Sequence, residues 1–245
     1  MDKEFDYSEG IPRKYANSDE LCKSVSKRFN SECLLSFSRG KDSIACYYQL
    51  KKHFKTVHIA YCMTAPDLEF EEESLKYYEK QFGQPIFSII HKATLRQLRN
   101  RVFQDPISDK VIANTWDIYN ESSWNEWLGF CKDAMGIEES VPVAIGNRIV
   151  DSIQRRQAFN KHGSYNPTRN VFYPIYDWPN QMIYDCLIEN KCKLPEEYKY
   201  LYRSFDGLQY AYIVYLRDHR KKDFERLLEW YPLLNVEILR YEKRN

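Results

Sequence analysis

The residues best suited to chemistry in this 245-residue chain lie between positions 36 and 43. They follow an apolar run at 33–35 and precede a helix-like stretch at 44–50. A strand that turns directly into a helix aims backbone N–H groups and the positive helix end at one point, an arrangement that binds phosphate or sulfate. We therefore predict a nucleotide-binding anion site made by Ser36, Ser38, Arg39, Gly40, Lys41, Asp42 and Ser43.

Two other interpretations apply to this stretch. The Walker A loop, G-x-x-x-x-G-K-[ST], does not fit, because Leu35 stands at its first Gly and Asp42 at its hydroxyl position. An ordinary Ser/Gly/Asp turn would also look like this. The stretch resembles the pyrophosphate-binding PP-loop, S-x-G-x-D-S, of the adenine-nucleotide alpha-hydrolase superfamily. That superfamily includes ATP pyrophosphatases and phosphoadenylyl-sulfate (PAPS) reductases.

Two further segments resemble the PAPS-reductase branch and follow in that family's order. Residues 146–155 match G-x-R-x-x-[ED]-S-x-x-R, and residues 173–178 are similar to the P-[IL]-x-D-W step. The resemblance implies that Arg148 and Arg155 clamp the anion, since two guanidinium groups bind an anion through paired hydrogen bonds. The alternatives are a solvated helix face for the arginines and a helix cap for Asp177.

Apolar runs alternate with helical patterns along the chain. We expect strands at 33–37, 56–63 and 85–90, and helices at 18–29, 41–53 and 69–82, the last ended by Gly83 and Pro85. Alternation of this kind indicates parallel strands joined by right-handed crossovers. The predicted fold is therefore α/β, a Rossmann-like parallel sheet of the PP-loop type, with the ligand at the carboxyl ends of the strands.

The segment after the second strand should face the same crevice, which makes Thr64 and Asp67 candidate crevice residues. The competing interpretation is that Asp67 caps the acidic helix that follows and Glu69 complements its dipole.

We predict three regions: an N-terminal helical segment (1–30), a nucleotide-binding domain (31–200) and a C-terminal helical extension (201–245). A helical insertion at about 104–140 interrupts the domain. Its aromatic residues could stack on a base, but packing against the sheet is favoured. They are Trp116, Trp124, Trp127 and Phe130. The extension reads as two amphipathic helices ended by Pro232, with a charge run at 217–222 that could contact a nucleic-acid or protein partner.

Composition favours a compact cytoplasmic protein without a membrane partner. The formal net charge is +1 and the pI is about 7.5, so the chain as a whole lacks a basic field. The N-terminal residues lack the basic and apolar regions of a secretory signal. Seven scattered cysteines indicate reduced thiols packed as small hydrophobic groups.

Cysteine and histidine spacing predicts no zinc site, no iron–sulfur cluster and no other metal site. The resemblance implies ATP or a PAPS-like adenine nucleotide as ligand, with Mg²⁺ accompanying ATP.

The sequence departs from the family in two places. Arg39 replaces the usual first Gly of S-G-G-K-D-S, and residues 240–245 differ from the Cys-bearing tail of PAPS reductases. Three hypotheses follow. The first is that the chain is an ATP pyrophosphatase or an adenylyl-transfer enzyme, with nucleic acid as one candidate acceptor. Alternatively, it is a sulfonucleotide reductase that uses Cys186, Cys192 or a partner's thiol, or a non-catalytic accessory protein. No residue is assigned a catalytic role.

Overall fold

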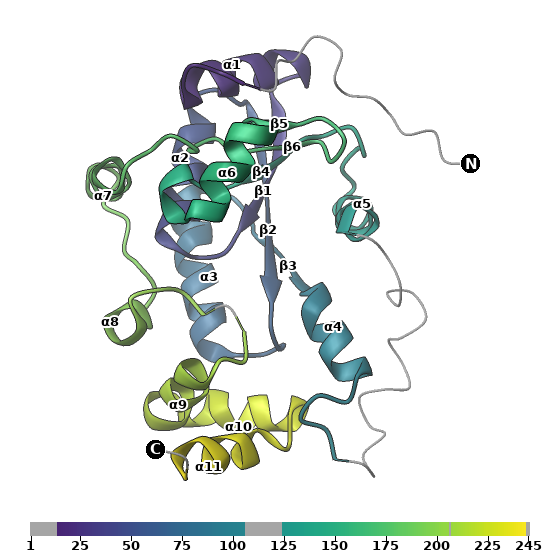
Figure 1. The fold of residues 1–245 in the computed structure, drawn as a ribbon, viewed down its shortest axis with the longest axis vertical. Coiled ribbons are helices and arrows are strands. Elements are labelled where there is room, and N and C mark those ends of the chain that lie inside the picture. Colours follow the sequence, from purple (N-terminus) through teal and green to yellow (C-terminus); the bar gives the residue numbers. More distant parts are fainter. Residues whose placement is uncertain (1–13, 106–123, 206, 244–245) are drawn as a thin grey trace. The chain divides into compact units, whose positions relative to one another are not determined.

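A computed structural model describes residues 14–105, 124–205 and 207–243 (Figure 1). The chain forms two compact units. The first unit holds the described residues up to 61 together with 85–87 and 131–194, and the second unit holds the others.

Most strands of a six-stranded, mostly parallel sheet belong to the first unit. The strands are β1 (Glu32–Phe37), β2 (Thr56–Met63), β3 (Phe87–Ile90), β4 (Val143–Ile145), β5 (Tyr165–Asn166) and β6 (Val171–Phe172). Their order is β3-β2-β1-β4-β6-β5. Most of β3 and the last residues of β2 belong to the second unit. Strand β1 is parallel to β2 and β4, β4 is parallel to β6, and β5 is antiparallel to β6. This topology confirms the predicted Rossmann-like α/β class.

Strand β1 lies inside the sheet because its side chains are apolar on both faces. Cys33, Leu34 and Leu35 are at most 1% exposed, as expected for a strand covered on both sides. Burying each leucine contributes about 2 kcal/mol. Helix α2 (Lys41–Lys51) contacts β1 and β4, and α7 (Asn180–Glu189) packs on α2. The start of α2 is thereby fixed at the carboxyl end of β1.

Helix α1 (Ser18–Arg28) is tied to α2 in the same unit. Asn17 caps this helix, because its side chain accepts a hydrogen bond from the N–H of Glu20. Asp19 then accepts from Gln49 at 2.8 Å and contacts His53 at 3.0 Å. Beyond β4 come the short 3₁₀ helix η1 (Ile149–Asp151) and α6 (Ile153–His162).

The second unit is built mainly of helices. They are α3 (Glu69–Phe82), α4 (Lys92–Arg99), α8 (Tyr198–Leu201), α9 (Tyr210–His219), α10 (Lys221–Trp230) and α11 (Leu234–Glu242), and α5 (Trp124–Ala134) runs from this unit into the first. Helix α3 matches the predicted bounds, and Gly83 ends it with a φ of 68°.

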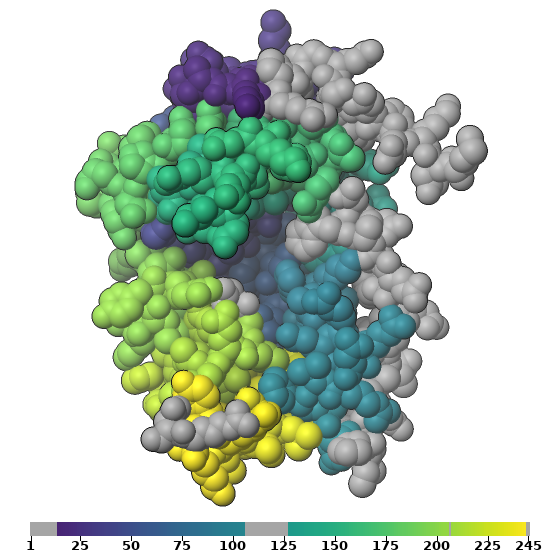
Figure 2. Space-filling model, in the orientation of Figure 1, coloured from purple at the N-terminus to yellow at the C-terminus, as the bar shows by residue number. Residues whose placement is uncertain are grey.

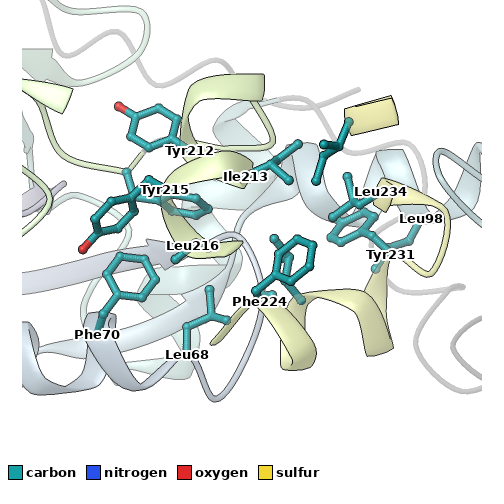
Figure 3. Close-up of a cluster of buried hydrophobic side chains, with 14 residues drawn as sticks. Leu68, Phe70, Leu98, Tyr212, Ile213, Tyr215, Leu216, Phe224, Tyr231 and Leu234 are labelled. Carbon is teal, nitrogen blue, oxygen red and sulfur yellow. The ribbon is translucent and has the colours of Figure 1, made fainter. Parts of the chain in front are cut away.

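A buried apolar cluster holds this second unit together (Figure 3). Phe70 from α3 meets Tyr215 from α9 with ring centroids 6.4 Å apart. The prediction of two C-terminal helices is wrong in number, because α11 forms after Pro232. Leu234 and Ile238, one helical turn apart, bury themselves in the cluster and hold α11 in place.

Helix α3 is capped by a residue from α10. The carboxylate of Asp223 accepts hydrogen bonds from the N–H groups of Glu69 and Phe70. Asp67 adopts a left-handed φ of 60°, and its carbonyl accepts from Arg226. The cap predicted for Asp67 is therefore wrong, and the actual cap comes from more than 150 positions away.

The predicted insertion at 104–140 lies partly outside the described residues, and so does Trp116. Its described part contains α5, in which Trp127 is only 2% exposed. Trp127 is thus a packing residue of the second unit. The three predicted regions of the chain stay a prediction.

No helix in the described ranges has both the length and the apolar character that crossing a membrane requires.

Asp223→Ala should destabilise the protein by about 1–2 kcal/mol, because α3 loses its cap. Urea unfolding measures the change. Asp218→Ala is the matched control, since Asp218 is exposed on α9 and pairs only with Arg217 among the described residues. It should cost under about 0.5 kcal/mol. Equal effects of the two substitutions would contradict the assignment of Asp223 as the cap.

Candidate functional site

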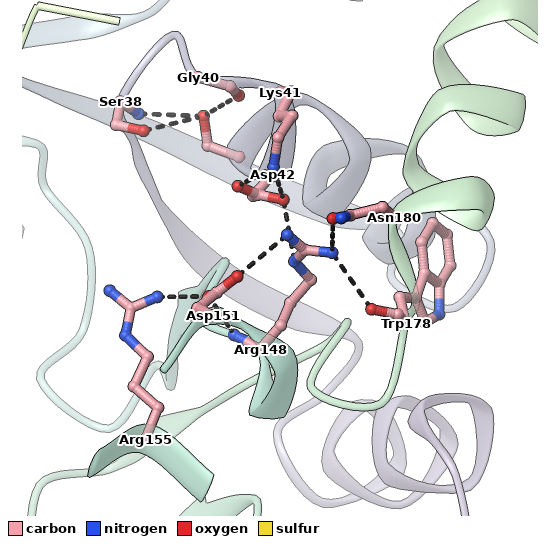
Figure 4. Close-up of polar contacts among 10 residues, drawn as sticks. Ser38, Gly40, Lys41, Asp42, Arg148, Asp151, Arg155, Trp178 and Asn180 are labelled. Atoms are coloured by element: carbon pink, nitrogen blue, oxygen red, sulfur yellow. Dashed lines mark hydrogen bonds and ion pairs between the residues drawn. The ribbon is translucent and has the colours of Figure 1, made fainter. Parts of the chain in front are cut away.

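The loop between β1 and α2 is held in shape by two serines (Figure 4). The Oγ of Ser43 accepts from the backbone N–H and the hydroxyl of Ser38, both at 3.2 Å, and donates to the carbonyl of Gly40 at 2.9 Å. Helix α2 begins directly afterwards at Lys41. The first N–H groups of a helix have no partner within it, so they offer donors to an anion at this point.

Arg39 supports this loop from inside. Its φ is +60°, in the left-handed region that favours glycine, at a cost of about 1 kcal/mol or more for another residue. The side chain is fully buried, its Nε donates to the hydroxyl of Tyr61 at 3.2 Å, and its guanidinium lies 5.3 Å from the centroid of that ring. The anion contact predicted for the Arg39 side chain is therefore replaced by a structural contact.

The other predicted loop residues are partly brought together. Lys41 lies at the start of α2, and its Nζ is 2.9 Å from both carboxylate oxygens of Asp42. Ser36 remains within β1, opposite Ala60 of β2 and Ile145 of β4. No described side-chain hydrogen bond joins Ser36 to the loop.

Arg148 is an almost fully enclosed charged group of the site. Its side chain is 3% exposed. The Nε lies 2.9 Å from Asp42 Oδ1, one terminal nitrogen lies 2.9 Å from Asp151 Oδ1, and the other donates to Trp178 O and Asn180 Oδ1 at 3.3 and 3.0 Å. Figure 4 shows the guanidinium in the middle of these four groups.

Arg155 approaches the same carboxylate from the solvent side. Its side chain is 45% exposed and pairs with Asp151 Oδ2. Asp151 also accepts from the backbone N–H of Arg148 at 2.9 Å, which closes η1. The two arginines thus converge on Asp151, and only Arg155 presents a surface to solvent. The sequence predicted that both arginines clamp the anion, and contact of either arginine with a ligand stays a prediction.

The charges of this cluster nearly balance. Lys41, Arg148 and Arg155 are positive and Asp42 and Asp151 are negative, so three positive and two negative groups leave one positive charge. Because Arg148 and Lys41 both contact Asp42, its charge repels an anion at the start of α2 less strongly. The net charge of the cluster is therefore positive, which favours an anion over a cation as a nearby ligand.

Gly146 allows the cluster to assemble. A Cβ at this position would lie 3.1 Å from the backbone oxygen and 3.2 Å from the backbone carbon of Asp42. The turn after β4 therefore presses directly against the backbone of α2, and only glycine permits that approach without a shift.

The segment at 173–178 secures the cluster from a third side. The Trp178 carbonyl accepts a hydrogen bond from the Arg148 guanidinium. Asp177 accepts from the backbone N–H of Ser18 at 3.1 Å and from its hydroxyl. Asp177 thus binds the first residue of α1, whereas the sequence suggested a cap on the helix that follows it. Nothing in the sequence indicated Asn180 as a partner of Arg148.

Thr64 and Asp67 belong to the second unit. Thr64 is buried, and Asp67 precedes α3. Their place in a crevice beside the loop stays a prediction.

No protein-family model matches this chain, and no curated protein matches it in sequence. Three solved structures are similar to it. One is the PAPS reductase from Candida auris in its phosphate complex, with 10% identity, a TM-score of 0.44 and coverage of 75% of this chain and 84% of that one. Another is the U34-tRNA thiolase NcsA from Methanococcus maripaludis with its [4Fe-4S] cluster, with 13% identity, a TM-score of 0.40 and coverage of 96% and 88%.

The third is the NH3-dependent NAD synthetase from Campylobacter jejuni in complex with nitrate, with 13% identity, a TM-score of 0.44 and coverage of 91% and 92%. All three belong to the PP-loop superfamily that the sequence motifs resemble. Similarities this distant assign neither a reaction nor a substrate to this chain. Its function has to be inferred from its own residues.

The cofactor expectation requires a correction. The sequence excluded an iron–sulfur cluster from cysteine spacing, yet NcsA, a structure similar to this chain, carries a [4Fe-4S] cluster. Spacing alone was an insufficient ground, because folding brings cluster ligands together from distant segments. Among the described residues, no group of three or more His, Cys, Asp or Glu side chains is placed to hold a metal ion.

Gly146→Ala should destabilise the protein by about 1–3 kcal/mol, because the added methyl group would force α2 and the turn after β4 apart. Gly129→Ala is the control: it lies within α5 with nothing within 4 Å of an added Cβ, and it should be neutral or stabilising. Thermal unfolding of both variants makes the comparison. A neutral Gly146→Ala would show that the close approach is not required.

The two arginines should differ sharply in their effect on folding. Arg148→Ala leaves two partly buried carboxylates without their main partner and should cost about 2–3 kcal/mol. Arg155→Ala removes one exposed ion pair and should cost under about 0.5 kcal/mol. Urea unfolding measures both variants. Equal costs would contradict the structural role assigned to Arg148.

Proposed function

We propose that the first unit binds the phosphate end of an adenine nucleotide and that the chain is an ATP pyrophosphatase or an adenylyl-transfer enzyme. The observation that carries this proposal is the loop at 38–43, which joins the end of an interior parallel strand to the start of α2. Ligands of open parallel sheets bind outside the carboxyl ends of the strands, which is where this loop lies.

Different residues of the chain have different roles in binding the nucleotide. The N–H groups at the start of α2 and the Nζ of Lys41 hold the terminal phosphates, and the serine hydrogen bonds keep the loop open for them. Arg148 holds Asp42 away from the anion and fixes the turn after β4. Arg155, which is exposed, is the arginine available to contact the ligand directly.

In the reaction, an acceptor oxygen attacks the α-phosphorus. A new P–O bond forms as the bond to the bridging oxygen breaks, and pyrophosphate leaves with the electron pair of that bond. Catalysis then comes from orientation and charge neutralisation and needs no covalent residue of the protein.

Thiol chemistry is less favoured by the described cysteines. Burial raises the pKa of Cys186 to about 11 and that of Cys131 to about 12, and it also raises the pKa of Cys22, Cys33 and Cys46. A reductase needs a thiolate near neutral pH. Cys192 is partly exposed, so sulfite release from PAPS that disappears in Cys192→Ser would favour the reductase instead.

Lys41→Gln should weaken ATP binding about tenfold or more, because a charge-assisted hydrogen bond worth about 1.5–3 kcal/mol is lost. Lys51→Gln makes the same charge change at the other end of α2 and should leave the affinity unchanged. Calorimetry of the wild type should give a dissociation constant between about 1 μM and 1 mM.

The same titration is run with PAPS and with adenosine bisphosphate. No heat with any of the three nucleotides would refute the site. Binding of ATP without pyrophosphate release, across a panel of acceptors, would favour a non-catalytic accessory protein over an enzyme.

A further inference from the structure

Helix α6 is almost uncovered by the rest of the described first unit. Nine of its ten residues are exposed, and only Phe159 is buried. The Phe159 ring packs edge-on against Tyr173, with centroids 4.9 Å apart. Both helix ends are fixed, because Ser152 accepts from the Arg155 N–H and Gly163 donates to the Phe159 carbonyl. In Figure 2, the green surface of this helix lies at the front of the visible face.

The stretch that contains α6 is strongly basic in an otherwise acidic chain. Residues 152–176 carry four of the 36 Lys and Arg residues and none of the 35 Asp and Glu residues. The rest of the chain therefore has 32 positive and 35 negative groups, a formal charge of −3. The chain's net charge of +1 hides this separation.

Three of the four cations are available to a partner. Arg155 pairs with Asp151, but Arg156, Lys161 and Arg169 form no ion pair with any carboxylate in the described part of the chain, and all three are exposed. An uncompensated group of cations within one short stretch of the chain raises the local positive potential and attracts polyanions.

A cleft of about 290 Å³ lies at the C-terminal end of α6. Its lining residues are His162, Asn166, Pro167, Thr168 and Arg169. An imidazole, an amide, a hydroxyl and a guanidinium there supply hydrogen-bond donors, and Asn166 already accepts from the Arg169 backbone N–H. Such a set of groups suits a phosphate and its sugar.

We propose that α6 and this cleft form a nucleic-acid-binding surface, contacted mainly through the phosphate backbone. Exposed amides neighbour the cations along the helix, at Gln154, Gln157 and Asn160. Amides contact both phosphates and base edges in protein–nucleic acid complexes. A membrane is a poor partner, because membrane-surface helices need a broad apolar face and α6 exposes only Ile153 as a large apolar side chain.

This surface lies beside the nucleotide site in the chain. Helix α6 follows η1, whose Asp151 binds both Arg148 and Arg155. A polynucleotide on α6 would thus reach Arg155, the exposed arginine of the cluster. Binding of a polynucleotide to α6 does not depend on the proposed reaction. If both occur, the bound polynucleotide is a candidate acceptor for that reaction.

The test is fluorescence anisotropy with a labelled RNA of about 20 nucleotides, the same sequence as single-stranded DNA, and the duplex DNA. The expected dissociation constant is about 10⁻⁴–10⁻⁶ M for contacts to phosphates alone. With about three phosphates neutralised, affinity should fall roughly 15- to 60-fold between about 50 and 200 mM salt. Whichever of the three probes binds tightest identifies the preferred form.

The decisive variant is Arg156→Gln/Lys161→Gln/Arg169→Gln, which should bind at least about tenfold more weakly and show a flatter salt dependence. The control Lys27→Gln/Arg28→Gln/Lys55→Gln removes the same charge near the end of α1 and the start of β2 and should bind within about twofold of the wild type. Both variants have a formal net charge of −2, three below the +1 of the wild type. Equal losses in both would overturn the proposal.

Two further measurements keep the assignment falsifiable if the decisive variant folds poorly. Ultraviolet crosslinking of wild-type protein to the RNA should map to residues 153–169, and a map elsewhere would overturn the proposal. Poly-glutamate that competes as well as nucleic acid would also overturn it and would indicate an acidic protein partner. ATP titration of the decisive variant separates this result from the nucleotide site, because Lys41 and Arg155 are intact in it.

Discussion

The site of the first unit depends on the contacts made by the buried guanidinium of Arg148. It joins the start of α2 through Asp42, the 3₁₀ turn through Asp151, and the chain beyond β6 through Trp178 and Asn180. A buried charge is costly unless it is paired and hydrogen-bonded, so each of these partners is needed to keep the others in place. Three loops that follow different strands are thereby fixed around one point.

Glycine and serine set the distances within this frame. Gly146 lets the turn after β4 touch the α2 backbone, and Ser43 shapes the loop that precedes the helix. Arg39 adopts a backbone conformation that suits glycine, and its burial against Tyr61 supplies the compensating contacts. The loop is therefore held from inside, whereas a glycine there would leave it held only by its serines.

The sequence predicted the local features well because they depend on neighbouring residues. The strand, loop and helix at 33–51 follow from apolar runs and a Ser/Gly turn, and α3 ends where Gly83 allows it. The Asp223 cap, the Asp177–Ser18 contact and the Arg148–Asn180 bond were missed, since each joins residues far apart in sequence. A carboxylate gives no local sign of which helix start it will bind.

The same distinction separates the two arginines of the 146–155 motif. The motif alone does not distinguish the two arginines. In the structure, Arg148 is enclosed by four groups and Arg155 is exposed. A motif names residue types, whereas burial decides whether a guanidinium is a structural tie or a ligand contact. Because Arg148 is buried and already contacts four protein groups, a negatively charged ligand at this site gains most from Arg155, Lys41 and the α2 N–H groups. The basic surface of α6 begins next to Arg155, so a long anion that reaches this arginine would meet further positive charge along the helix.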